Sequence, residues 1–80
     1  SANDLPAALS YFEDLKNNHE SYVGTYYHLG GLYEKLGRKE DAISTYQKGM
    51  QVAREARDNH AFSELQTVYN SAMGFNYEDD

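Results

Sequence analysis

Apolar and small residues recur with a helical period in two neighbouring stretches at the centre of the chain. The first stretch carries Tyr26, Leu29, Gly30 and Tyr33, and the second carries Ala42, Ile43, Tyr46, Gly49, Met50 and Ala53. Each set lies on one face of a 3.6-residue period, which is the pattern of an amphipathic helix. Gly37 lies between them, and glycine takes the positive φ that commonly follows a helix end. The pattern therefore predicts two antiparallel helices joined by a tight turn.

The patterning predicts one further helix on each side of this hairpin. The expected helices run from about Pro6 to Lys16, Tyr22 to Leu36, Lys39 to Arg57 and Asn59 to Met73. No stretch alternates apolar and polar residues with an enrichment of β-branched side chains, so no strand is expected. The fold class is predicted to be all-α.

Residues that commonly begin or end helices stand near these boundaries. The suitable N-cap residues are Asn3 or Asp4 for the first helix and Ser21 for the second, because their side-chain oxygens accept from free backbone N–H groups. Asp58-Asn59 is expected to end the third helix or cap the fourth. Gly74 is a suitable stop for the fourth, with Phe75 folding back as the apolar contact past the end.

Residue size adds a second pattern to the hairpin. Glycine within a helix costs roughly 1 kcal/mol against alanine, and a helix usually keeps it where another backbone comes close. Small and large residues alternate across the two helices, which is how a hairpin packs without voids. The residues predicted to be mostly buried are Leu29, Tyr33, Ala42, Ile43, Tyr46, Leu65 and Tyr69, and packing is also expected of Tyr11 and Tyr26.

These residues resemble a tetratricopeptide repeat (TPR) of 34 residues, spanning Val23 to Ala56. The family pattern of aromatic, leucine-glycine, tyrosine, alanine, aromatic and small residue is matched by Tyr26, Leu29, Gly30, Tyr33, Ala42, Tyr46 and Gly49. Tyrosine replaces the usual tryptophan, glycine replaces the usual alanine, and Arg54 stands where a closing proline is common. The resemblance implies antiparallel helix hairpins stacked as a short right-handed solenoid of about four helices.

The flanking helices match the repeat in part. Ala8 and Phe12 lie 34 residues before Ala42 and Tyr46, so the first helix resembles the second helix of an earlier repeat. The last helix resembles the start of a further repeat, although Gln66 replaces the expected glycine. We expect a single TPR-like domain over residues 1–75, with a half repeat at 5–20, a full repeat at 23–56 and a half repeat or cap at 59–74. Residues 76–80 are expected to form a disordered acidic tail.

Composition limits the function classes. The 80 residues include 7 basic and 13 acidic residues, giving a net charge of −6, and no cysteine. An acidic chain does not favour nucleic-acid binding, which needs lysine and arginine at the phosphates. No apolar run approaches the roughly 20 residues that span a bilayer, and no signal peptide is recognised. We expect no membrane or nucleic-acid partner, and a cytoplasmic location is favoured. The basic cluster Lys35, Arg38 and Lys39 is read as a solvated turn rather than an anion site.

No motif in the chain predicts catalysis, a metal site or a cofactor. Nucleotide-binding loops and hydrolase or metalloprotease motifs are absent from the sequence. The three histidines, His19, His28 and His60, do not have metal-ligand spacing. The pairs Glu13-Asp14 and Glu40-Asp41 are helix neighbours that point about 100° apart, whereas acid–base catalysis needs opposed groups. We therefore expect a protein that is not an enzyme and holds no cofactor.

The resemblance implies a role in protein–protein interaction. In TPR proteins the first helix of each repeat lines a concave groove that holds a peptide or partner helix. The corresponding residues here are Gly24, Tyr27, Gly31, Glu34 and Lys35, with His60, Ser63, Thr67, Asn70 and Ser71 from the last helix. Some members grip a partner's C-terminal carboxylate with lysine and asparagine. Tyr27 and Gly31 occupy two of those places, so the pattern does not favour carboxylate capture.

The alternative role is structural, either as a segment of a longer solenoid or as a self-associating unit. The first helix matches a second repeat helix without its partner, so part of its apolar stripe is expected to be exposed. Leu5, Leu9 and Phe12 are the residues predicted to contact a second copy in a homodimer, or an upstream repeat. Phe75 is expected to cover the opposite end.

Overall fold

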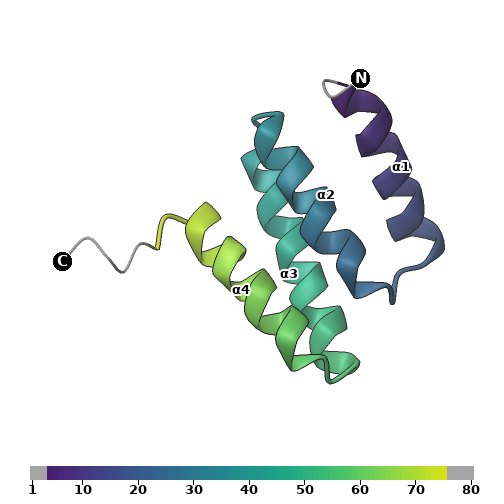
Figure 1. The fold of residues 1–80 in the computed structure, drawn as a ribbon. Helices are drawn as coiled ribbons and strands as arrows, with labels where there is room; N and C mark the ends of the chain where they lie inside the picture. Colours follow the sequence, from purple (N-terminus) through teal and green to yellow (C-terminus); the bar gives the residue numbers. More distant parts are fainter. Residues whose placement is uncertain (1–3, 76–80) are drawn as a thin grey trace.

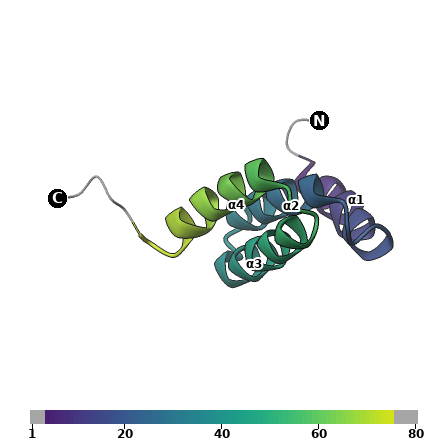
Figure 2. The same cartoon turned by 90° about the horizontal axis from the view of Figure 1, so that it is seen from below.

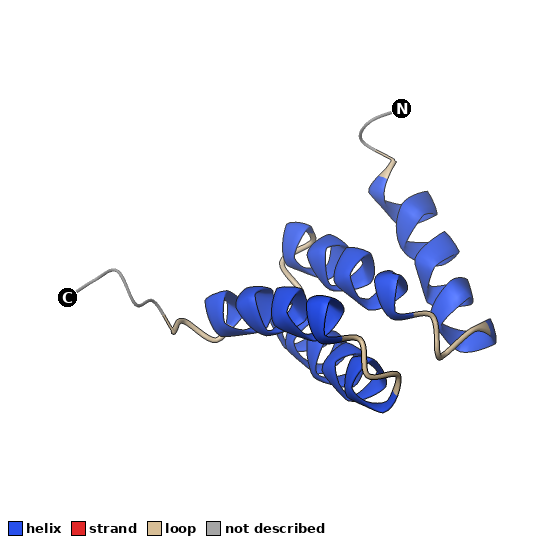
Figure 3. Cartoon of the chain, turned by 60° about the horizontal axis from the view of Figure 1, so that its bottom comes forward, coloured by secondary structure: helices blue, strands red, loops and turns tan. Residues whose placement is uncertain are grey.

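A computed structural model describes residues 4–75 of the chain. It contains α1 (Leu5–Asn18), α2 (Val23–Lys35), α3 (Lys39–Glu55) and α4 (Asn59–Ala72), with no strand within the described residues (Figure 3). Every predicted helix boundary lies within two residues of the observed one, so the all-α prediction is confirmed. The predicted acidic tail, 76–80, lies outside the described residues.

Acidic side chains cap two of the helices. Asp4 at the start of α1 and Asp58 at the start of α4 each accept a hydrogen bond from the backbone N–H three residues later, at 3.3 and 3.0 Å. The prediction that Ser21 caps α2 is wrong, because Tyr22 occupies the N-cap position and no side chain caps that helix. Ser21 lies one residue too early for its hydroxyl to serve the first free N–H groups.

Helices α2, α3 and α4 end in the same backbone turn. The left-handed residue is Gly37 (φ 75°) after α2 and Gly74 (φ 86°) after α4, as predicted, but it is Arg57 (φ 58°) after α3. At each end the next residue's N–H bonds to the carbonyl five residues back, at 2.8 to 2.9 Å. The prediction that Phe75 covers the end of α4 is wrong. Its side chain is 49% exposed, because Gly74 turns the chain away from the other helices (Figure 1).

The helices are arranged so that each packs mainly on its neighbours in sequence. The hairpin α2–α3 forms the centre, α4 packs on α3 and also touches α2, and within the described residues α1 packs on α2 alone (Figure 1). Seen from below, α2 and α4 lie in one layer and α3 lies in the other (Figure 2). This order places the first helix of the central hairpin beside the last helix of the chain.

Two side-chain contacts between helices involve equivalent positions of the repeat. The Tyr33 hydroxyl on α2 donates to Glu13 Oε2 on α1 at 2.6 Å, and Gln47 Nε2 on α3 donates to the Tyr69 hydroxyl on α4 at 3.4 Å. Glu13 and Gln47 are 34 residues apart, and the two tyrosines are 36 residues apart. The two contacts therefore join equivalent positions of the α1–α2 and α3–α4 pairs, with tyrosine as donor in the first and acceptor in the second. The half-repeat interpretation of the two flanking helices stays a prediction.

The core lies between α2, α3 and α4. Its buried apolar residues are Tyr26, Leu29, Tyr33, Ala42, Tyr46, Val52, Ala53, Leu65 and Ala72. Of the predicted core, Ile43 and Tyr69 are only half-buried. The expectation that Tyr11 packs inside is wrong, since it is 61% exposed. Among residues 4–75, α2 is the only helix against which α1 packs, and Tyr11 lies outside the half-buried stripe that includes Leu9 and Phe12.

Two glycines permit the close approach of α2, α3 and α4. A Cβ atom at Gly30 would overlap the ring of Tyr46, so the tyrosine ring of α3 rests directly on the backbone of α2. A Cβ atom at Gly49 would lie 2.5 Å from Tyr26 Cβ and 3.1 Å from Leu65 Cδ1. The small-against-large packing that the sequence predicted is therefore present, with each glycine opposite an aromatic residue.

Candidate functional site

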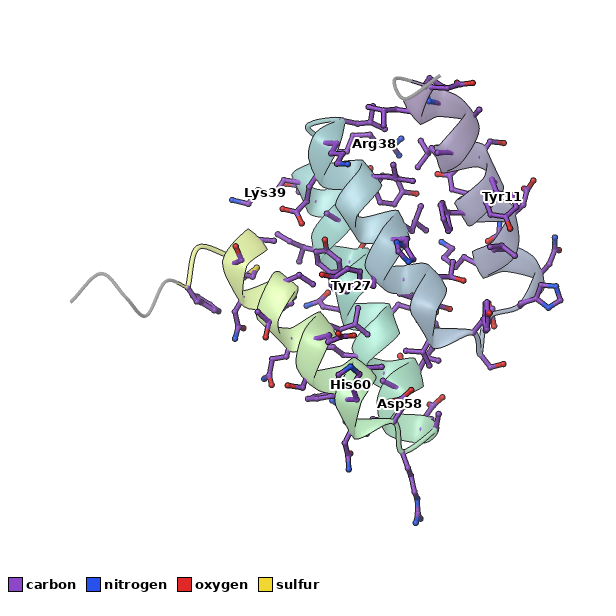
Figure 4. The ribbon with its side chains drawn as sticks, viewed as in Figure 1. Tyr11, Tyr27, Arg38, Lys39, Asp58 and His60 are labelled. Atoms are coloured by element: carbon purple, nitrogen blue, oxygen red, sulfur yellow. The ribbon has the colours of Figure 1, made fainter. Side chains whose placement is uncertain are left out.

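The residues expected to bind a partner lie on α2 and α4, which touch each other and share one layer. We call this surface the α2–α4 face, and it consists of Gly24, Tyr27, Gly31, Glu34 and Lys35 from α2 with Ser63, Thr67 and Asn70 from α4. Gly31 and Asn70 are half-buried, and the other six are exposed. His60 and Ser71, also expected here, are exposed on α4. Figure 4 shows Tyr27 directed from α2 toward α4, with His60 in the first turn of α4.

Two glycines leave open space on this face. A Cβ atom at Gly24 or Gly31 would meet no other atom within 4 Å. These glycines differ from Gly30 and Gly49, whose missing side chains are required by the packing of the chain itself. The backbone of α2 is consequently accessible between the side chains of Tyr27 and Glu34.

The Glu34 carboxylate is held by a residue of α3. The Tyr46 ring crosses α2 at Gly30, and its hydroxyl donates to Glu34 Oε2 at 2.6 Å. Burial of the ring raises the pKa of Tyr46, and the hydrogen bond to Glu34, the Glu34 charge and the nearby Tyr27 raise it further. Tyr46 is thus a neutral donor well above pH 7, which keeps one oxygen of Glu34 fixed.

Tyr27 begins a row of aromatic contacts that leads away from the face. It is 43% exposed and meets His28 edge-on, with ring centroids 5.9 Å apart. His28 in turn stacks on Phe12 of α1 at 5.5 Å, and Phe12 meets Tyr11 at 5.1 Å. Aromatic pairs at these separations attract each other, so these contacts help to hold the Tyr27 ring on its side toward α1.

Comparison with known proteins decides the family. A family model described as Tetratricopeptide repeat matches residues 23–55. The solution NMR structure of a tetratricopeptide repeat domain protein from Salinibacter ruber is 44% identical, covers 99% of this chain and 80% of that chain, and superimposes with a TM-score of 0.88. The chain belongs to the tetratricopeptide repeat family.

A crystal structure of a TPR domain protein from Salinibacter ruber is also similar. It is 47% identical, with 94% of this chain and 84% of that chain covered, and a TM-score of 0.87. No curated protein sequence matches the chain. The predicted short right-handed TPR solenoid is confirmed by these likenesses, and TPR domains are generally protein-interaction modules.

The contribution of Tyr46 to the α2–α4 face of this TPR domain was missed by the sequence analysis, which placed the residue in the core alone. Both statements hold, because its ring is 2% exposed while its hydroxyl reaches Glu34. The available signal was Gly30, which is positioned for a ring to cross, followed four residues later by an acceptor on the same helix face.

The basic cluster at the α2–α3 turn of the TPR hairpin is partly engaged within the chain. Arg38 Nε bonds Asp41 Oδ2 at 2.8 Å, and its guanidinium lies 4.6 Å from the centre of the Tyr33 ring. Figure 4 shows Arg38 and Lys39 at the end of the hairpin that is remote from His60. These contacts agree with the interpretation of a solvated turn.

Side chains of the metal-binding type are scattered over this TPR domain. Within residues 4–75, no three histidine, aspartate or glutamate side chains gather as a metal site would require. His60 pairs with Glu64 at 3.2 Å along α4, and His28 stacks on Phe12. No helix among the described residues is both long and apolar enough to cross a membrane.

Proposed function

We propose that this TPR domain is a non-catalytic interaction module whose α2–α4 face binds a segment of a partner protein. The observation that carries the proposal is the exposed Tyr27 ring beside the open Gly31 and the fixed Glu34. Exposed aromatic rings are enriched among the residues that dominate binding energy. Open glycine positions allow a ligand backbone to approach α2 closely.

The face also offers polar groups for a bound backbone. Ser63 and Thr67 are exposed on α4, and Asn70 is half-buried beside them. The Thr67 hydroxyl donates to the Ser63 carbonyl at 3.0 Å, which leaves its lone pairs available to a donor. A segment lying between the two helices would therefore meet an aromatic and acidic side on α2 and a neutral polar side on α4.

The proposal can be tested by selecting binders from a displayed library of random peptides and measuring their affinity by calorimetry. Gly31→Gln places a side chain in the open part of the face, and this replacement should not weaken the fold because a Cβ atom at Gly31 meets no other atom within 4 Å. Peptides selected on the wild type should bind this variant at least tenfold more weakly. Lys48→Gln, on the exposed surface of α3, is the matched control and should bind as the wild type does. Absence of selectable peptides, or equal binding to Gly31→Gln, would reject the proposal.

A second candidate function is self-association or stacking on another repeat through α1. Within residues 5–18 no residue is fully buried. Leu9 and Phe12 pack against the core, and Leu5, Leu9 and Phe12 each keep part of their surface exposed. This exposed part of α1 is the surface that a second copy or an upstream repeat would cover, as expected for a repeat end without a polar cap. Sedimentation over a wide concentration range should show a growing mass that Leu9→Glu abolishes. A constant monomer mass would exclude the homodimer.

A further inference from the structure

The carboxylate of Glu34 and the ring of Tyr27 lie on the same side of α2, seven residues or about two turns apart. Gly31 lies between them and leaves the intervening space open. The Tyr46 hydroxyl bonds Glu34 Oε2 and thereby fixes the orientation of the carboxylate. The other oxygen, Oε1, consequently has a defined position as well. An exposed ring and a positioned negative charge on the same side of a helix, with open space between them, are a pair of groups that attracts a cation.

Glu34 has no cationic partner among the described residues. Arg38 pairs with Asp41, and His60 Nε2 lies 3.2 Å from Glu64 Oε2, so neither group is a partner of Glu34. The part of the face contributed by α4 consists of the neutral side chains Ser63, Thr67 and Asn70. Lys35, the next residue after Glu34, points about 100° away around the helix. The negative charge at the centre of the face is therefore not neutralised by the described part of the chain.

The chain itself contains a related arrangement, in which a cation lies on the ring of a tyrosine that bonds a carboxylate. The Tyr33 hydroxyl donates to Glu13 at 2.6 Å, as the Tyr46 hydroxyl does to Glu34. In that first pair a guanidinium lies on the tyrosine ring, because Arg38 is 4.6 Å from the centre of the Tyr33 ring, and the carboxylate that pairs with this arginine is that of Asp41. The tyrosine–carboxylate pair on the α2–α4 face is accompanied by the exposed ring of Tyr27, and no arginine of residues 4–75 lies on that ring.

We propose that the α2–α4 face recognises a lysine or arginine side chain of the bound segment, with the cation placed between the Tyr27 ring and the Glu34 carboxylate. This inference rests on the proposed function, since it specifies the kind of segment that the face binds. The partner is a basic segment of another protein, which agrees with the net charge of −6 on this chain. Tyr46 is a positioning residue, because it acts on the cation only through Glu34.

The selected peptides provide the first test. In wild-type selections, lysine or arginine should be enriched at one peptide position, and the enrichment should vanish when the selection is repeated on Glu34→Gln. Glutamine still accepts the Tyr46 hydrogen bond, so this variant removes charge without removing the contact. Glu40→Gln, at the start of α3, is the control for the loss of one negative charge, and it should retain the enrichment.

A double-mutant cycle on one selected peptide provides the second test. Replacing its lysine or arginine by glutamine should weaken binding to the wild type about tenfold, as for a charge-assisted hydrogen bond, and should have little effect on Glu34→Gln. Tyr46→Phe should lower the affinity of the basic peptide more than that of the neutral one. Added salt should weaken the binding of the basic peptide to the wild type and should have little effect on its binding to Glu34→Gln.

The outcomes separate this inference from the proposed function. If peptides bind in a manner blocked by Gly31→Gln but show no preference for lysine or arginine, the basic-segment inference is overturned and the binding face stands. If Gly31→Gln blocks nothing, the binding face itself is rejected. Enrichment of lysine that survives in Glu34→Gln would also overturn the assignment of the cation site.

Discussion

Gly30→Ala is expected to destabilise this domain, against the general rule for helices. Glycine in a helix interior costs about 1 kcal/mol relative to alanine, so the substitution is usually favourable. At Gly30 the added Cβ would overlap three atoms of the Tyr46 ring. That ring cannot move aside easily, because it is 2% exposed and its hydroxyl is bonded to Glu34.

The neighbouring residue provides the matched comparison. Gly31 lies on the same helix, and a Cβ there would meet no atom within 4 Å. Gly31→Ala should therefore gain the helix propensity of about 1 kcal/mol without a packing cost. Overpacking of a core by added carbon atoms costs typically about 1–3 kcal/mol. Both variants gain the same helix propensity, so they should differ from each other by the packing cost alone, roughly 1–3 kcal/mol.

Thermal and urea unfolding followed by circular dichroism would measure this difference. For a domain of this size each kcal/mol shifts Tm by roughly 4–8 °C, so the two variants should melt on opposite sides of the wild type. In a Tyr46→Leu background, the cost of Gly30→Ala should shrink, because the ring that the methyl group meets is gone. If Gly30→Ala melts at or above the wild-type temperature, α2 and α3 do not pack ring-on-backbone as described.

Three further predictions concern stability and charge. Tyr33→Ala should lower the free energy of unfolding by roughly 3–5 kcal/mol in urea denaturation, because it removes a buried aromatic ring; a loss below 1 kcal/mol would contradict the assigned core. Burial, the hydrogen bond to Glu13 and the charge of Glu13 raise the pKa of Tyr33 to about 12 from an ordinary value of 10.0. The contribution of the protonated Tyr33 to the free energy of unfolding is therefore complete below pH 10 and should be lost as the pH rises from about 10 to about 12. Unfolding measured across this range should show a shallower decline for Tyr33→Phe, and identical slopes would refute the assignment. No binding to duplex or single-stranded nucleic acid is expected in gel shifts at physiological salt, given the net charge of −6, and micromolar salt-sensitive binding would overturn this.

The helical framework could be predicted from sequence because its signals are local. The period of the apolar residues and the glycine after α2 depend on a few neighbouring positions, and both were matched by the structure. Arg57 was missed as the left-handed residue after α3, because arginine carries no preference for that conformation. Tyr11 was wrongly predicted to be buried because its exposure depends on how many helices surround α1, which is decided by the packing of the whole fold and not by the local sequence.

The candidate site was predictable in its positions but not in its internal contacts. The family pattern indicated Tyr27, Gly31 and Glu34 as surface residues of α2. The hydrogen bond that orders Glu34 comes from Tyr46, twelve residues later and on another helix. Its formation depends on the distance between two helix backbones, and that distance follows from three-dimensional packing at Gly30 rather than from any spacing in the chain.

The equivalent positions of the Glu13–Tyr33 and Gln47–Tyr69 contacts predict that the domain can be lengthened by duplication. A second copy of residues 23–58 inserted between Asp58 and Asn59 would place Gln47 opposite a new Tyr33, and Asp58 would again precede the first turn of a helix. In tandem arrays stability grows with each internal repeat and its interface. Every insertion would also add another Tyr27, Gly31 and Glu34 to the same surface. The extended chain would then display these groups as a regular ladder, with spacing set by the packing of one hairpin on the next.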